Sequence, residues 1–362
     1  MLTGPHGPRA GMSASAPAWL GDVDVAVVSH NGRQTLPRVL ACLASAGAPP
    51  DRISLYDIAS TDDTRPWLAR EWPAVRVFAM ATNDGPNPAR NRAIADATRP
   101  YLLLVDSDAF LQPDAPAALW SAAIGQATVG AAVPVVVHDR DPGRIQYAGS
   151  HLHFVCEAIT PWANRSITER GSENADIGTA PGVCFLLNVA AAQSIGGFDE
   201  RYFMGKEDGE FCFRLRAGGF RLVEAPAAIA EHGSRPRSTW LYPFQIRNRW
   251  HFMLKNYEAR TLALIAPALL VHEPLQFVIL LMKGEVRAYF QAVRDLRGLA
   301  RGLGRDRREV AAHRRTHDRD ILSAAPFAVR ADLAGGGVSR VAKRIYDGWL
   351  MAYWSVASLL LR

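Results

Sequence analysis

Hydrophobic positions in the first third of the chain fall into short runs that are separated by helical stretches. Leu36, Val39, Leu40 and Leu43 recur three or four residues apart, which is the spacing of one helix face. On either side of such stretches lie four runs of aliphatic and β-branched residues: 25–28, 53–58, 75–79 and 102–105. Strands that alternate with helices predict βαβ units on a largely parallel sheet. We therefore expect an α/β fold over residues 23–138.

Polar residues stand at the ends of three of these runs. In chain order they are Ser29, His30 and Asn31, then Asp57, then Asp106 and Asp108. In parallel α/β sheets, ligands bind beyond the carboxyl ends of the strands. These side chains are therefore expected to share one rim of the sheet, in a half of the domain that binds a nucleotide.

The pattern changes twice further along the chain. After residue 138 it loosens into longer loops that carry an acidic cluster at Glu207, Asp208 and Glu210. Residues 1–20 mix Gly, Pro, Ala and Ser without the apolar core of a signal peptide, which predicts a flexible leader. The predicted organisation is a leader (1–20), an α/β domain (21–256, with halves 21–138 and 139–256) and a helical region (257–362).

The helical region combines apolar and basic patterns. Residues 257–282 are apolar but are interrupted by two prolines, His272 and Glu273, which argues against a simple spanning helix and favours a place in the membrane interface. Residues 286–308 place an apolar stripe and an arginine stripe on one predicted helix, a combination that suits an anionic bilayer surface. A last helix is predicted over 338–361, with an aromatic and aliphatic end that is short for a span.

Composition narrows the class of protein. With 362 residues, 49% of them hydrophobic and 21% charged, the chain can bury a large core, and it has no repeat or collagen-like pattern. Residues 283–319 hold eleven basic and five acidic residues, an excess equal to the whole formal net charge of +6. Such a patch predicts an anionic partner, either phospholipid or nucleic acid. Four widely spaced cysteines without a C-x-x-C pair indicate reduced thiols and a cytosolic location.

Asp106 and Asp108 form a D-x-D sequence at the end of a predicted strand. Mg²⁺ and Mn²⁺ prefer oxygen ligands and offset the charge of a diphosphate, so this turn can aim one carboxylate at a metal and the other at a ribose. Two solvated loop carboxylates are the structural alternative. The D-x-D sequence alone does not distinguish a metal and ribose site from two solvated carboxylates.

A wider set of motifs resembles glycosyltransferase family 2, whose members have the GT-A fold. The matching segments are 25–31 (VAVVSHN), 56–62 (YDIASTD), 83–91 (NDGPNPARN), and 197–200 (GFDE) followed by 207–208 (ED). Together they extend over residues 23–232, in the order and spacing of the family. The helical region after residue 257 is similar to that of bacterial members that act on lipid-linked acceptors.

The resemblance implies metal-dependent, inverting transfer of a sugar from a nucleotide diphosphate to an acceptor hydroxyl. It implies donor contacts from Ser29, His30, Asn31, Asp57, Arg90 and Asp106, Mg²⁺ or Mn²⁺ ligands at Asp106, Asp108 and His232, and a general base at Asp208. Glu207 and Arg249 become acceptor-side candidates, and Arg247 becomes a phosphate contact. For Arg90, capping and packing of the next helix is an equal alternative, and for His232 so is a structural role. The partners implied are a nucleotide sugar, a glycan or lipid-linked acceptor, and the anionic inner face of the cell membrane.

Two positions depart from the family pattern. Ile58 stands where the family usually has Asn, and Lys206 stands where an aromatic or small residue is more common, so donor choice is left open. A nucleotidyltransferase would need a Gly-rich phosphate loop after the first strand, which 28–32 (VSHNG) does not supply. A non-catalytic membrane scaffold predicts loss of the acidic residues, which are present. A nucleic-acid binder would not need apolar residues beside the arginines, and no nucleic acid is expected.

Overall fold

The computed structural model describes residues 17–233, 239–327 and 337–361, with side chains described from residue 341 in the last segment. Residues 1–16 of the predicted leader lie outside the described residues. The end of the predicted leader, residues 18–20, is not flexible chain but part of the folded domain. Ala18–Gly21 forms a short 3₁₀ helix in which Trp19 and Leu20 are buried, because their apolar side chains join the core of the first half-domain.

A central sheet of ten described strands organises the α/β domain, in the order β10-β12-β6-β11-β4-β1-β2-β3, where β10 is Ala175–Ile177. Outside this order, β5 (Ala109–Leu111) pairs with β12, and β7 (Asp141–Tyr147) pairs with β6. Four neighbouring strands are parallel, as predicted: β1 (Val23–Ser29), β2 (Ile53–Asp57), β3 (Arg76–Ala79) and β4 (Tyr101–Asp106). β11 (Cys184–Asn188) then pairs antiparallel with β4 and with β6 (Val129–His138), and β6 pairs in parallel with β12 (Arg221–His232). The two halves of the domain therefore share one sheet.

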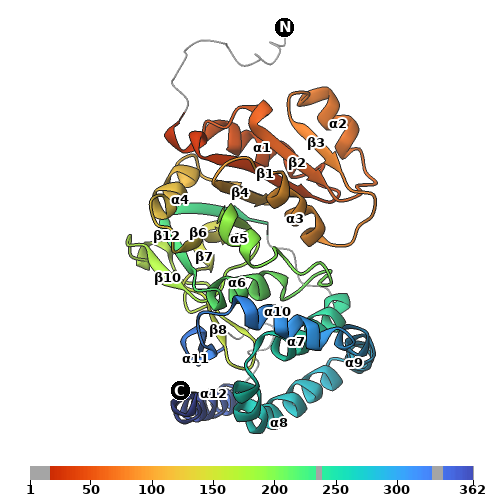
Figure 1. The fold of residues 1–362 in the computed structure, drawn as a ribbon, viewed down its shortest axis with the longest axis vertical. Coiled ribbons are helices and arrows are strands. Elements are labelled where there is room, and N and C mark those ends of the chain that lie inside the picture. The colour runs from red at the N-terminus through yellow and green to blue at the C-terminus, as the bar shows by residue number, and fades with distance from the viewer. Residues whose placement is uncertain (1–16, 234–238, 328–336, 362) are drawn as a thin grey trace.

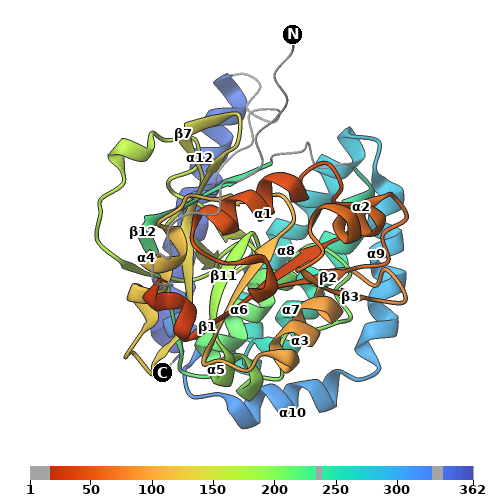
Figure 2. The ribbon, with the colours of Figure 1, turned by 90° about the horizontal axis from the view of Figure 1, so that it is seen from above.

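Helices cover both faces of this sheet (Figures 1 and 2). One core cluster lies under α1 (Leu36–Ser45), α2 (Thr64–Glu71) and α4 (Ala115–Ala123). A second cluster lies under α3 (Pro86–Asp96), α5 (Val189–Ser194) and α6 (Glu207–Ala217). The mixed α/β sheet with helices on both faces confirms the predicted fold class.

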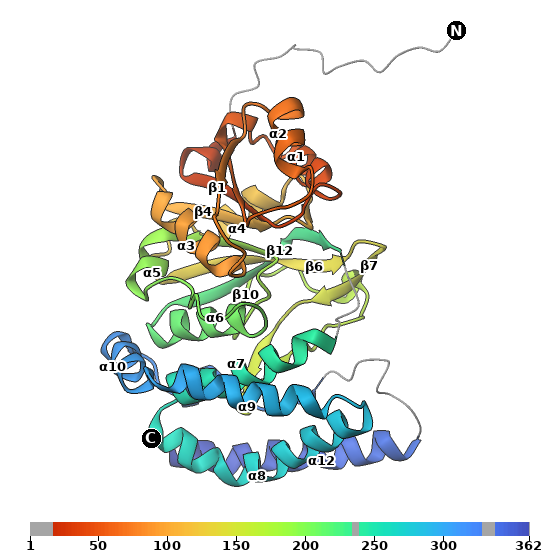
Figure 3. The same ribbon diagram turned by 90° about the vertical axis from the view of Figure 1, so that its right-hand side faces the viewer.

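The helical region forms a separate layer beneath the sheet domain (Figure 3). Its elements are α7 (Tyr242–Asn256), α8 (Ala259–Met282), α9 (Val286–Ala300), α10 (Leu303–His313), α11 (Asp318–Ile321) and α12 (Gly337–Ala357), which continues into a 3₁₀ turn at Ser358–Leu360. A small sheet of β8 (His151–His153), β9 (Ala158–Ile159) and β13 (Leu322–Ser323) joins this layer to the domain.

One feature of the helical region differs from the sequence prediction. The single helix predicted over 286–308 is interrupted at 301–302, where Gly302 precedes α10 and Asp306 turns inward to Arg201 of the domain. In contrast, α8 continues through Pro267 and Pro274, because both prolines lie on its exposed side while Ile265, Ala268 and Leu269 pack inward. Within the described residues α8 is the one helix long and apolar enough to cross a membrane by length and composition, with 28% of that stretch buried.

Candidate active site

The predicted rim forms at the carboxyl ends of β1, β2 and β4. Ser29 pairs in register with Asp57, and Val28 pairs with Asp106. Adjacent strands lie about 4.8 Å apart, so residues from three segments of the chain converge on one edge. The geometric part of the prediction is confirmed, whereas the role of each residue remains a prediction.

Two loops on this rim hold each other in place. Asn31 takes up a left-handed conformation with φ of 50°, and its side-chain Oδ1 accepts a hydrogen bond of 2.8 Å from the Thr61 amide. The Asn31 amide donates to Ser60 Oγ at 2.8 Å, and His30 Nδ1 lies 2.6 Å from the Ile58 carbonyl oxygen. Ile58 contributes its backbone carbonyl oxygen to this contact, so its side chain, which departs from the family pattern, does not affect the contact. These contacts preorganise the loops that follow β1 and β2.

Asp57 carries an unused acceptor beneath these loops. Its side chain is fully buried, and Oδ2 accepts a hydrogen bond of 3.2 Å from the Ser60 amide and lies 3.4 Å from Arg65 Nε. Its other oxygen, Oδ1, and the neighbouring Ser29 Oγ are buried without a partner among the described residues. Buried polar atoms are almost always hydrogen-bonded, so such an orphaned pair marks a place where a ligand completes the bonding.

The D-x-D turn brings two of the three predicted metal ligands together. After Asp106 the chain turns into β5 (Ala109–Leu111), whose Ala109 pairs with His232 at the end of β12. His232 Nε2 consequently lies 3.6 Å from Asp108 Oδ1, while its Nδ1 is 2.9 Å from Gln146 Oε1. No group of three or more His, Cys, Asp or Glu side chains within the described residues is arranged to hold a metal. A carboxylate and an imidazole leave the remaining positions to substrate oxygens and water, which is common for Mg²⁺.

Arg90 joins the donor rim to the second half-domain. Its side chain is 2% exposed, and its Nη2 donates to both oxygens of Asp106 at 3.1 and 3.2 Å. Its Nη1 donates to Asp208 Oδ1 at 2.7 Å. Burial raises the pKa of Asp106 to about 7, and the carboxylates of Asp108 and Asp208 add to the rise, whereas Arg90 opposes it. The guanidinium therefore holds together carboxylates that would otherwise repel each other.

Gly182, which the sequence reasoning did not single out, makes room for this bridge. A Cβ atom at Gly182 would lie 2.4 Å from Asp208 Oδ1 and 2.5 Å from Arg90 Nη2. Real Cβ atoms do not approach other atoms so closely, so a side chain here would displace the bridge. The sequence gives no signal for this role, because the glycine lies in a loop between the family motifs.

Asp208 and Glu207 begin α6 and differ in accessibility. The Asp208 side chain is 23% exposed, and Arg90 engages its Oδ1, which leaves Oδ2 without a hydrogen-bond partner among the described residues. Glu207 is buried, its Oε2 has no partner, and burial together with the charge of Asp208 raises its pKa to about 8. Of the two carboxylates, Asp208 is the better placed to meet an acceptor.

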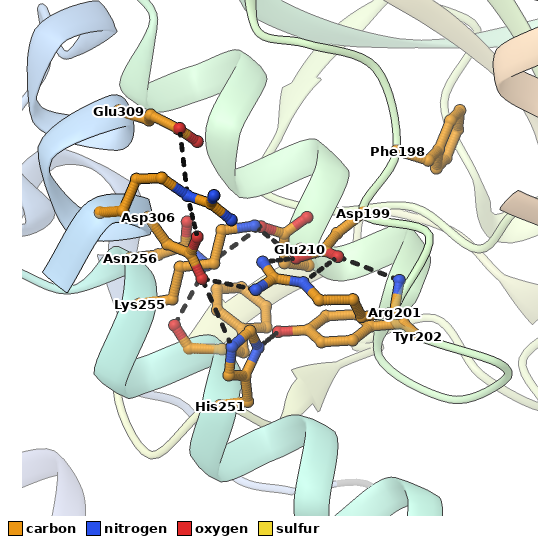
Figure 4. A network of polar contacts seen from close by, with 12 residues as sticks. Phe198, Asp199, Arg201, Tyr202, Glu210, His251, Lys255, Asn256, Asp306 and Glu309 are labelled. Atoms are coloured by element: carbon orange, nitrogen blue, oxygen red, sulfur yellow. Dashed lines mark hydrogen bonds and ion pairs between the residues drawn. The ribbon is translucent and has the colours of Figure 1, made fainter. Parts of the chain in front are cut away.

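The Gly-Phe-Asp-Glu motif at 197–200 anchors α6 rather than contributing groups to the rim (Figure 4). Asp199 lies 2.6 Å from Lys255 Nζ on α7 and is held by Arg201, and these cations keep its pKa well below the ordinary value. Lys255 also lies 2.9 Å from Glu210, two residues beyond Asp208. Asn91 bonds both backbone groups of Phe198, which ties the helix of Arg90 to the same motif.

Two arginines predicted near the substrates are engaged elsewhere. Arg249 is 1% exposed, pairs with Glu273 of α8 and donates to the Val155 carbonyl oxygen at 3.1 Å. The prediction that it contacts the acceptor is not supported, because packing against α8 turns the guanidinium away from solvent. Arg247 donates to Asn248 Oδ1 at 2.8 Å and to the Arg201 carbonyl oxygen at 3.2 Å. The second bond joins α7 to the segment that contains Arg201.

Comparison with known proteins places these motifs in a family. Residues 24–196 match the model described as Glycosyl transferase family 2. The N-acetylglucosaminyl-diphospho-decaprenol L-rhamnosyltransferase of Mycobacterium tuberculosis, from strains CDC 1551 / Oshkosh and ATCC 25618 / H37Rv, is 30% identical over 232 residues, which cover 58% of this chain and 75% of that protein.

A solved structure, GalNAc-T7 with UDP, GalNAc and Mn²⁺, superposes with a TM-score of 0.52 at 17% identity, over 66% of this chain and 48% of that one. The chain thus spans about half the length of GalNAc-T7, and a likeness at this identity concerns the fold alone. The bacterial relative is matched over three quarters of its length, and the family match covers the strands that build the rim. The chain therefore belongs to glycosyltransferase family 2 and is a glycosyltransferase with the GT-A fold.

Proposed function

We propose that this enzyme moves a sugar from a nucleotide diphosphate to a hydroxyl group of a lipid-linked acceptor, with inversion at the anomeric carbon. The observation that carries the proposal is the Arg90 bridge. One guanidinium contacts Asp106 on the donor rim at 3.1 Å and Asp208 at 2.7 Å. Because a guanidinium is a small planar group, the two carboxylates are near enough to act on one reaction centre.

The donor's nucleoside would bind at the rim, beside the loops that follow β1 and β2. Asp57 Oδ1 is buried without a partner among the described residues and would accept a hydrogen bond from an N–H group of the base. The preorganised loops that contain Ser29, His30 and Asn31 would contact the same nucleoside. Asp106, which follows in the next strand of the rim, would face the ribose.

Asp108 and His232 fit a divalent cation that is bound jointly with the donor. Their side chains come from two elements and lie 3.6 Å apart, and a carboxylate with an imidazole suits Mn²⁺ as well as Mg²⁺. When bound, such an ion would offset the negative charge that develops on the diphosphate.

Asp208 would be the general base. Its free Oδ2 would accept the proton of an acceptor hydroxyl at about 2.6 to 3.2 Å as the hydroxyl oxygen attacks the anomeric carbon. The bond from that carbon to the diphosphate breaks in the same step, and the nucleoside diphosphate leaves with the bonding electrons. Arg90 fixes the orientation of the carboxylate through Oδ1.

The acceptor class follows from the bacterial relative and from the helical layer. The relative's name describes an acceptor that is an N-acetylglucosaminyl lipid diphosphate. We extend the lipid-linked class, without its particular sugar or lipid, to this enzyme, and we assign the enzyme to the cytoplasmic face of an anionic membrane in cell-envelope glycan synthesis. The four free cysteines agree with a reducing compartment.

A panel of nucleotide sugars tests the proposal, with and without Mn²⁺ or Mg²⁺, in the presence of a membrane lipid extract. Metal-stimulated transfer from one donor is expected, and Asp208→Asn should lower kcat by about 10²- to 10⁴-fold while donor binding persists. Glu207→Gln is the matched control and should retain most of the activity. Absence of transfer from every donor, or full activity in Asp208→Asn, would contradict the proposal.

A further inference from the structure

Most of the exposed large apolar side chains in the described structure lie on α8 and α12, at the base of the molecule (Figure 3). The two helices run antiparallel, because His272 contacts Tyr346 and the Leu264 carbonyl oxygen accepts a hydrogen bond from Tyr353. Large apolar side chains that are at least 36% exposed line this pair, which we call the platform: Leu270, Val271, Leu275, Val278, Ile279, Leu281 and Met282 on α8, and Val341, Ile345, Trp349, Met351 and Val356 on α12. A patch of this extent marks an interaction surface.

Contacts along its whole length hold α8 against the domain. Glu258, just before its first residue, exchanges hydrogen bonds with Asp318 of α11 at 2.6 and 3.0 Å. At its centre Glu273 pairs with Arg249 and accepts a hydrogen bond from the Trp250 indole at 3.1 Å. Beyond its end Lys283 donates to Tyr242 at 3.2 Å. A helix that crossed a bilayer would carry these polar partners into hydrocarbon, so α8 lies flat along the base although its length of about 36 Å would suffice to span.

The charges around the platform fit an anionic surface. In the described parts of α8, α9 and α12 every acidic side chain is buried or half-buried, namely Glu273, Asp295 and Asp347. The exposed charged residues of α9, beside the platform, are basic: Arg287, Arg294 and Arg297. Arg344 is likewise exposed on α12. Cations within one helix diameter of an apolar face are typical of helices that lie in the headgroup layer.

We propose that the platform inserts into one leaflet of an anionic bilayer, with α8 and α12 parallel to the membrane plane and the arginines of α9 at the lipid headgroups. The sequence likewise favoured a place in the membrane interface for residues 257–282, and it placed the whole arginine stripe of 286–308 at the membrane surface. In the structure α10 instead secures the layer to the domain, through Asp306 to Arg201 at 2.6 Å and through Arg307 to the Leu254 carbonyl oxygen.

This orientation fixes the height of the reaction centre above the bilayer. A chain of ion pairs runs from Glu273 on α8 to Arg249, then to Glu157 at 3.8 Å, then to Lys206 at 2.6 Å. Lys206 directly precedes Glu207 and Asp208, and its left-handed backbone with φ of 71° starts α6 at this point. The base therefore lies about one helix layer above the lipid. This assignment rests on the proposed function and specifies its acceptor. The acceptor is a membrane lipid with a short saccharide head rather than a soluble glycan.

The test compares Leu270→Glu/Ile345→Glu with the control Val77→Glu/Ile124→Glu, which makes the same charge change at exposed apolar positions outside the platform. Cosedimentation uses phosphatidylcholine vesicles with and without phosphatidylglycerol. The unaltered protein should bind, more tightly with phosphatidylglycerol, and should transfer to empty vesicles that are added later, which a spanning helix would not do. The platform variant should lose at least tenfold in binding, since each buried aliphatic side chain is worth about 1.5 to 3 kcal/mol and 1.4 kcal/mol is tenfold. The control should bind as the unaltered protein does.

Transfer assays separate this inference from the proposed function. The platform variant should lose transfer to a long-chain lipid diphosphate sugar in vesicles and keep transfer to a water-soluble short-chain analogue. Equal vesicle binding by both variants would overturn the membrane assignment. Loss of a dimer as the sole effect of the platform variant would also overturn it, in favour of a contact between two copies of the chain. Vesicle binding without transfer to any acceptor would instead contradict the proposed function.

Discussion

Replacing Arg90 by methionine removes the cation that Asp106 and Asp208 share. Arg90 is 2% exposed, and its partners are 28% and 23% exposed, so the pair of ion pairs is largely shielded from water. Removing one partner of a buried ion pair costs about 3 to 5 kcal/mol, because the remaining charge stays desolvated. Here two carboxylates remain and repel each other, but both are partly exposed to solvent, which screens the repulsion. We therefore expect a loss at the lower end of this range, about 3 kcal/mol in the free energy of unfolding.

Thermal and urea denaturation measure this loss. With an entropy of unfolding of about 2.1 cal/mol/K per residue, 1 kcal/mol lowers the Tm of a 362-residue chain by about 1.3 °C, so Arg90→Met should lower Tm by about 4 °C. The double variant Arg90→Met/Asp208→Asn should recover part of the loss, because one repelling charge is gone. Arg90→Lys is the conservative control; it keeps the charge but not the fork that reaches both carboxylates. A Tm within 2 °C of the unaltered protein, together with unchanged transfer, would refute the bridging role.

Three further predictions concern the same site. Gly182→Ala should lower kcat at least tenfold with little change in donor affinity, because the new Cβ atom would lie 2.4 Å from Asp208 Oδ1. Steady-state kinetics and calorimetry measure the two quantities, and an unchanged kcat would contradict this prediction. Because the pKa of Glu207 is raised to about 8, the folded state binds an extra proton between the unfolded pKa and pH 8, so stability falls as pH rises through this window. Glu207→Gln should therefore raise Tm at pH 8 in chelator-treated protein and have a smaller effect near pH 5, and a pH-independent difference would argue against the shift. Asp108→Asn and His232→Gln should each raise the Mn²⁺ concentration needed for half-maximal transfer about 10- to 100-fold at saturating donor, and an unchanged requirement would exclude that residue as a ligand.

Sequence patterns predicted the parts of this protein that depend on local order. The alternation of strands and helices predicts the parallel sheet over 23–138, and the polar residues after each strand predict the shared rim, because the carboxyl ends of parallel strands meet at one edge. The family motifs indicated Asp208 and Arg90, although they left Arg90 between a donor role and helix packing. The apolar and basic character of the last hundred residues was likewise visible without a fold.

Other predictions failed where distant contacts outweigh local preference. The helix predicted over 286–308 is interrupted because Asp306 finds Arg201, 105 residues earlier in the chain. Arg249 turned inward because Glu273 on the next helix offers a partner, and sequence spacing cannot weigh that pair against a substrate contact.

The family, the sheet, the rim and the candidate base can be predicted from the sequence alone, because hydrophobic periodicity and short motifs act over a few residues. How these parts meet depends on the tertiary structure. It set Arg90 between two carboxylates that lie 16 and 118 residues away, made Gly182 the space for that bridge, and laid α8 flat beneath the domain. Side chains so far apart in the chain find each other through the packing of a whole sheet and its helices, and that packing is not contained in any local pattern.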